Sequence, residues 1–95
     1  MDRKEAYQEK VEAQLEELNA RIGLLEAKAA KAKAEAKVQY GEQLEELHRK
    51  RQEVEERLEG LQAAGSEAWH EFATGVDEAL SALENAVTSA VAQFG

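Results

Sequence analysis

The chain has two histidines, and each stands three residues after a glutamate: Glu45 precedes His48, and Glu67 precedes His70. On a helix this spacing places both side chains on one face, which is half of a di-iron carboxylate site in a four-helix bundle. Such ligands must point inward and need further glutamates from facing helices. The inward positions beside these pairs are apolar, so we expect both histidines on solvated helix faces. Neither a metal nor another cofactor is predicted.

Other catalytic groups lack the context that their chemistry needs. Ser66, Ser81 and Ser89 stand outside any nucleophile elbow, and no cluster of basic residues surrounds them. Gly60 and Gly65 do not form a phosphate-binding loop. The chain has no cysteine, which excludes thiol catalysis, thiolate zinc sites and disulfides. We therefore expect a protein that is not an enzyme and has no catalytic residue.

The composition limits the classes of partner. The 95 residues carry 12 Lys and Arg against 20 Asp and Glu, a net charge of −8. This excess of acid disfavours nucleic acids and anionic membranes, because both attract clustered Lys and Arg. No apolar segment of a signal peptide follows Met1, and the longest uncharged stretch, the last 11 residues, is too short to span a bilayer. We expect one cytoplasmic helical unit over residues 1–95.

The first two thirds of the chain show the heptad spacing of a coiled coil, in which apolar residues alternate in steps of four and three. This pattern predicts one long helix over residues 3–62. Its seam is formed by Val11, Leu15, Leu18, Ile22, Leu25, Ala29, Ala32, Ala36, Tyr40, Leu44, Leu47, Val54, Leu58 and Leu61. Three consecutive steps of four between Ala32 and Leu44 predict a locally straight helix there. The alternative is a break at Gly41.

Charged residues on this segment support a helix. Four acid–base pairs are four residues apart with the acid first, and each is worth about 0.2–0.5 kcal/mol. They are Glu17 with Arg21, Glu45 with Arg49, Glu46 with Lys50, and Glu53 with Arg57.

A turn is expected over residues 63–66, where Gly60 and Gly65 precede Ser66, a candidate N-cap with Glu67 in the first turn. The second helix then begins near residue 66 or 67 and extends to 94. Its apolar residues follow an 11-residue repeat, which is close to the natural winding of a straight helix. They are Trp69, Phe72, Val76, Leu80, Leu83, Val87, Val91 and Phe94.

Together these elements predict an all-α helical hairpin. At about 1.5 Å per residue the first helix would be roughly 85–90 Å long and the second roughly 43 Å, so the second covers only half of the first. The apolar seam from Val11 to Ala36 would stay uncovered, and we expect chains to associate through it as a dimer or tetramer. Antiparallel pairing is preferred because the alanines allow close approach.

Two further residues have expected positions. Arg51, at a seam position, is expected to extend to solvent rather than pair with a facing glutamate. Trp69 is expected to close the end of the core.

The second helix is purely acidic. Residues 58–95 carry six acids and no Lys or Arg. This surface could dock a basic protein partner. A reversible lipid-surface binder acting through residues 69–94 is the alternative, although such helices usually carry Lys and Arg on their polar face.

The order of these features resembles short bacterial coiled-coil proteins described as stress-response proteins. The resemblance rests on the Ala/Lys block over residues 27–37, on Ala68–Trp69 with Phe72, and on the final Phe94–Gly95. It implies a non-enzymatic, bacterial, stress-associated role. We therefore expect a self-associating coiled-coil protein with a structural or interaction function.

Overall fold

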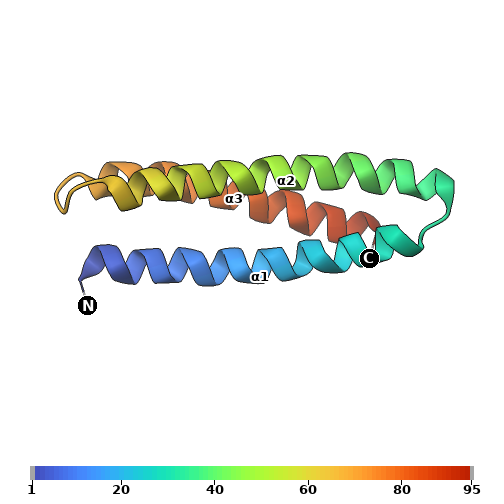
Figure 1. Cartoon of the computed structure of the whole chain (residues 1–95), viewed down its shortest axis with the longest axis horizontal. Helices are drawn as coiled ribbons and strands as arrows, with labels where there is room; N and C mark the ends of the chain where they lie inside the picture. Colours follow the sequence, from blue (N-terminus) through green and yellow to red (C-terminus); the bar gives the residue numbers. More distant parts are fainter. Residues whose placement is uncertain (1, 95) are drawn as a thin grey trace.

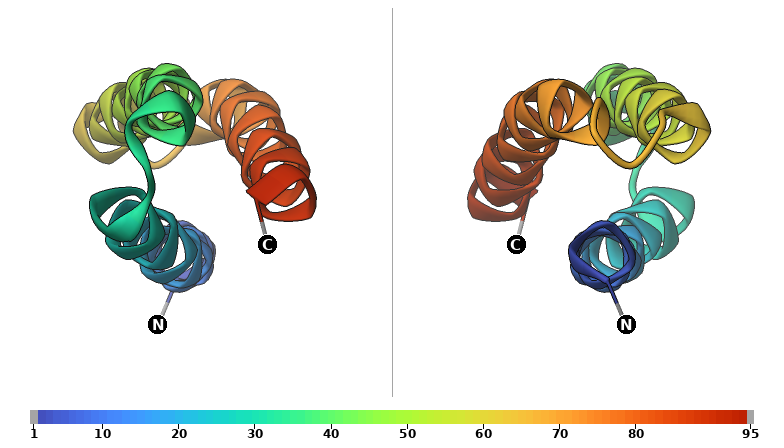
Figure 2. Two further views of the ribbon diagram at one scale, coloured as in Figure 1. Left: turned by 90° about the vertical axis from the view of Figure 1, so that its right-hand side faces the viewer. Right: turned by 90° about the vertical axis from the view of Figure 1, so that its left-hand side faces the viewer.

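The computed structural model describes residues 2–94, which form three α-helices: α1 (Arg3–Lys31), α2 (Ala34–Ala63) and α3 (Trp69–Phe94). Helices α1 and α3 run in the same direction, and α2, which lies between them in the sequence, runs in the opposite direction (Figure 1). Viewed end-on, the helices occupy the corners of a triangle (Figure 2). The molecule is therefore an up-down-up bundle, and the all-helical prediction is confirmed.

The predicted continuous helix over 3–62 is wrong. The helix ends at Lys31, Ala32 and Lys33 adopt extended backbone angles, and α2 begins at Ala34. The break does not fall at Gly41, which lies inside α2. The molecule consequently measures 51 × 19 × 17 Å, far shorter than the predicted hairpin.

The position of this break has a physical reason. Ala29, Ala32 and Ala36 are the smallest residues of the seam, and they are only half-buried. Because alanine has little apolar surface to bury, interrupting the seam here loses less than interrupting it at a leucine. Folding back then lets α1 bury its larger seam residues against α2 and α3, and this gain outweighs the helix preference of the Ala/Lys block.

The second connection spans residues 64–68. Helix α2 ends at Ala63, one residue beyond the expected end, and α3 begins at Trp69 rather than at residue 66 or 67. Residues 66–68 form a turn in which the Ala68 and Trp69 N–H groups both donate to the Gly65 carbonyl, at 3.1 and 3.2 Å. Ser66 is therefore part of the turn and does not begin the helix.

Helix termini and surface charges follow the sequence pattern in most places. Asp2 caps α1 by accepting a hydrogen bond from the Glu5 N–H at 2.8 Å. Three of the expected acid–base pairs form within residues 2–94, whereas Arg49 contacts Glu46 instead of Glu45. Arg57 also joins α2 to α3, because it donates to the Gly75 carbonyl at 3.0 Å.

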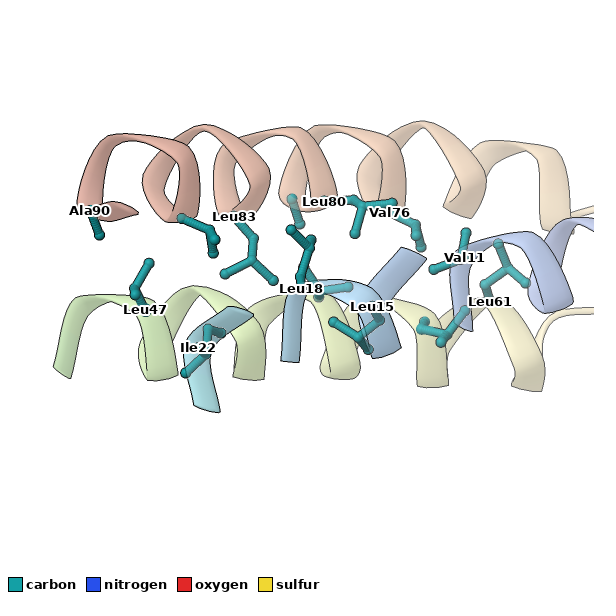
Figure 3. Packing of buried hydrophobic residues seen from close by; sticks show 14 of the residues in the cluster. Val11, Leu15, Leu18, Ile22, Leu47, Leu61, Val76, Leu80, Leu83 and Ala90 are labelled. Carbon is teal, nitrogen blue, oxygen red and sulfur yellow. The ribbon is translucent and has the colours of Figure 1, made fainter. Parts of the chain in front are cut away.

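Most of the core consists of residues of the predicted seam, and Ala79 and Ala90 complete it. Buried residues come from all of the helices and point into the centre of the bundle (Figure 3). They are Val11, Leu15, Leu18, Ile22, Leu25, Leu47, Val54, Leu58, Leu61, Trp69, Val76, Ala79, Leu80, Leu83, Val87 and Ala90. The seam of α1, expected to face solvent or a second chain, is thus covered within one chain.

A pair of neighbouring substitutions tests this packing. Ile22 is fully buried and Leu24 is 66% exposed on the same helix. Ile22→Ala should lower the free energy of unfolding by about 2–5 kcal/mol, because it leaves a cavity in the core. Leu24→Ala should change it by no more than about 0.5 kcal/mol. Urea unfolding followed by circular dichroism measures both, and equal losses would contradict this arrangement.

Candidate functional site

An aromatic cluster closes one end of the bundle. The rings of Tyr7 and Trp69 lie 5.7 Å apart, and His70 stacks on Trp69 with its ring centroid at 3.9 Å. Trp69 is buried, as the sequence predicted. At the other end, Tyr40 stacks on Phe94 at 4.1 Å. These pairs tie α1 to α3 at one end and α2 to α3 at the other.

Tyr7 carries the most perturbed titratable group of the described chain. Its hydroxyl donates toward the Ala73 carbonyl at 3.0 Å and toward Asp77 Oδ1 at 2.5 Å. Burial raises the pKa of the Tyr7 phenol above its usual range, and the hydrogen bond and negative charge of Asp77 raise it further. Tyr7 was absent from the predicted seam, although it stands four residues before Val11, so its spacing could have identified it.

Lys4 holds the same end of the bundle together. Its ammonium group donates to the carbonyls of Gln62 and Ala64, at 3.0 and 2.7 Å. Those carbonyls belong to the end of α2, where helical carbonyls lack partners, so a cation there is favourable.

A row of polar side chains in contact links the middle of α1 to α2. Arg51 donates to Asn19 Oδ1 at 3.3 Å and approaches His48 Nδ1 at 2.6 Å. Because a guanidinium group only donates, His48 Nδ1 accepts and the proton lies on Nε2, which faces Glu26 Oε1 at 3.5 Å. Arg51 is half-buried and bonds to an amide and an imidazole, so it does not extend to solvent as expected, and it does not pair with a facing glutamate.

The glutamates that suggested metal ligation are not assembled with the histidines. His48 contacts Glu26, from α1, and His70 contacts Trp69. Within residues 2–94, no three His, Asp or Glu side chains gather where they could hold a metal ion. The side chain of His48 instead joins α2 to α1, whereas His70 is exposed and stacks on its neighbour within α3.

A groove between α1 and α3 opens on the molecular surface. It has a volume of about 340 Å³ and is lined by Arg21, Leu24, Leu25 and Lys28 of α1 and by Thr88 and Val91 of α3. Its lining is mostly apolar: Leu24 is 66% exposed and Val91 40% exposed. Val91 was predicted to be a seam residue, but it lies at the open edge of the bundle.

The remaining seam predictions have mixed outcomes. Phe72 is 43% exposed and covers Gly60 of α2, where a Cβ atom would lie 3.4 Å from its ring. Leu44, Tyr40 and Phe94 are half-buried against the core. Leu24 was outside the predicted seam, and its position next to Leu25 gives no periodic signal.

Comparison of the chain with protein-family models, curated protein sequences and solved structures found no match. The resemblance to bacterial stress-response proteins therefore stays a prediction from the residues alone. No helix within residues 2–94 has the length and apolar character needed to cross a membrane.

The buried phenol makes stability depend on pH in the alkaline range. An unfolded tyrosine loses its proton near pH 10, whereas folded Tyr7 holds its proton to higher pH. The unfolded state therefore binds fewer protons, and the free energy of unfolding should fall as pH rises above about 10.

Tyr7→Phe should reduce this alkaline loss of stability, as measured by urea unfolding between neutral and alkaline pH. Tyr40→Phe is the matched control, because it removes a hydroxyl from the aromatic pair at the other end and leaves Tyr7 in place. An identical pH dependence in Tyr7→Phe and the wild type would contradict the assigned role of Tyr7.

Proposed function

We propose that this chain is a non-enzymatic structural or interaction protein that works by self-association, in the stress-associated role that the resemblance implies. The observation that carries the proposal is the apolar groove between α1 and α3. Leu24 and Val91 expose apolar surface on one face of a bundle whose other large apolar residues are mostly buried. Covering this face by a second copy would remove that surface from water.

The charges around the groove favour a second copy as the occupant. Its α1 edge carries Arg21 and Lys28. Next to the groove, Glu84 of α3 and Glu17 of α1 line a smaller hollow beside Arg21, and residues 58–95 hold no Lys or Arg. The bases beside the groove therefore lie on α1, and α3 contributes only acids.

A two-fold axis parallel to the helices would use both of these helices. It would place α1 of each copy opposite α3 of the other, so that bases face acids twice. The molecule is 51 Å long and 19 Å wide, which suffices for the roughly 800 Å² per partner that a specific interface buries. Because the apolar part of the face is small, we expect association in the micromolar range.

The lipid-binding alternative has less support. The apolar stripe of α3 is largely inside the bundle, where Val76, Leu83 and Val87 are fully buried. Binding to a lipid surface through this stripe would require the bundle to open, at the cost of its core packing. A basic protein partner would instead use exposed acids of α3 such as Glu71 and Glu78.

Two matched substitutions test the groove. Leu24 and Val38 are 66% and 64% exposed, but only Leu24 lines the groove, since Val38 lies on α2. Leu24→Asp should raise the dissociation constant of the dimer by about tenfold or more, because a charge would replace an apolar contact at the interface. Val38→Asp should leave it unchanged.

Sedimentation equilibrium over a concentration series that reaches the low micromolar range measures both constants. Circular dichroism checks that both variants keep the helicity of the wild type, as exposed positions should allow. A wild-type chain that remains monomeric at every concentration would overturn the proposed self-association. Equal effects of the two substitutions would remove the groove as its site.

A further inference from the structure

The connection between α1 and α2 is short and conformationally ordinary. It consists of Ala32, with φ −74° and ψ 157°, and Lys33, with φ −70° and ψ 157°. Within residues 2–94 no residue has a positive φ, so no left-handed glycine or asparagine ends α1 as in common helix C-caps. Changing the backbone angles of these two residues would make α1 and α2 one helix.

The residues around this connection prefer that continuous helix. Residues 27–37 consist almost entirely of Ala, Lys and Glu, which are among the best helix formers. Lys33 occupies the N-cap of α2, makes no side-chain capping bond, and places a cation where the helix macrodipole disfavours one. The local helix preference therefore opposes the turn at Ala32–Lys33. The turn is maintained by the packing of α1 against the other helices.

The contacts that hold α1 in place could be made equally by α1 of the same chain or by α1 of a second copy. Tyr7 bonds to Ala73 and Asp77, Lys4 bonds to carbonyls at the end of α2, and Glu26 faces His48. Partners in these contacts stand 22 to 70 residues apart in the sequence. If the connection straightened, the surface left on α2 and α3 would fit α1 of a second copy through the same contacts.

We propose that two copies of this chain exchange α1, with Ala32–Lys33 as the hinge, to form a dimer in which α1 and α2 are one continuous helix. The exchange keeps the contacts of the core and replaces a turn that the local sequence disfavours by a helix that it favours, at the entropic cost of association. Ala29, Ala32 and Ala36 would lie where the two long helices cross, and their small side chains allow close approach. This inference rests on the proposed self-association and names its structural basis.

A proline at the hinge distinguishes the folded-back monomer from the exchanged dimer, because it favours the first and disfavours the second. Lys33→Pro suits the turn, because φ of −70° matches proline, ψ of 157° at Ala32 suits the residue before it, and the Lys33 N–H bonds to no other backbone group of the described residues. In a continuous helix the same proline is strongly unfavourable. It should lower the exchanged fraction by at least about 100-fold. Lys33→Ala should raise that fraction by about two- to tenfold.

The experiment refolds the full chain from urea at high protein concentration and analyses the product by sedimentation. One preparation carries a spin label only at Glu12→Cys and another only at Glu56→Cys, both at exposed positions. Refolding the two together should give dimers whose intermolecular distance equals the intramolecular distance in a monomer labelled at both sites. Lys33→Pro should remove that signal while circular dichroism shows retained helicity.

The outcomes separate this inference from the groove dimer. A dimer that Lys33→Pro abolishes and Leu24→Asp leaves intact supports exchange. A dimer that persists in Lys33→Pro and is lost in Leu24→Asp overturns exchange and leaves the proposed self-association standing. A chain that stays monomeric overturns both. If Lys33→Pro fails to fold, insertion of a short Gly/Ser segment between Ala32 and Lys33 is the second variant, and a dimer of unchanged proportion would then overturn exchange.

Discussion

The burial of α1 against α2 and α3 is the interaction on which the rest of this molecule depends. Val11, Leu18 and Ile22 are almost completely buried only because α1 folds back along the bundle. That return requires two extended residues inside a segment that prefers to be helical. The fold is therefore a balance in which apolar burial exceeds a local helix preference.

Polar and aromatic contacts fix the register of this packing. Lys4 holds the start of α1 to the end of α2, Tyr7 joins it to α3, and the chain from Asn19 through Arg51 and His48 joins the middle of α1 to α2. A three-helix core made only of Leu, Val and Ile would tolerate sliding by one turn. Directional hydrogen bonds remove that freedom, since shifting α1 along its axis would break them together.

Periodicity identified most of the core but not the path of the chain. The heptad positions from Val11 to Leu25 and from Leu47 to Leu61 lie on buried helix faces, because side-chain spacing determines which face of a helix is apolar. Val11 to Leu25, however, were expected to be covered by a second chain, and they are buried within one. The break at Ala32 was missed because neither Ala nor Lys is a turn residue. Its cause is tertiary, and only the competing burial of α1 against α2 and α3 shows it. Phe72 and Val91 follow the 11-residue repeat, but both side chains lie at the edge of the bundle and stay partly exposed to solvent.

The same balance connects the fold to the proposed function. A bundle that closes its own core leaves a limited apolar edge at Leu24 and Val91, and the connection that closes it runs against the local helix preference. The proposed association with further copies of the chain would use both features. An exchanged dimer would retain its α1–α3 grooves, so the two modes of assembly are compatible.

The most direct test of this account measures the distance between α1 and α2 in the monomer. Spin labels at Glu12→Cys and Glu56→Cys on one chain, diluted with unlabelled protein at a concentration where sedimentation shows monomer, report whether α1 folds back. The account predicts a distance of about 20–30 Å, because neighbouring helix axes are about 10 Å apart and each label adds length. A distance near 65 Å, the span of a continuous helix at about 1.5 Å per residue, would contradict it.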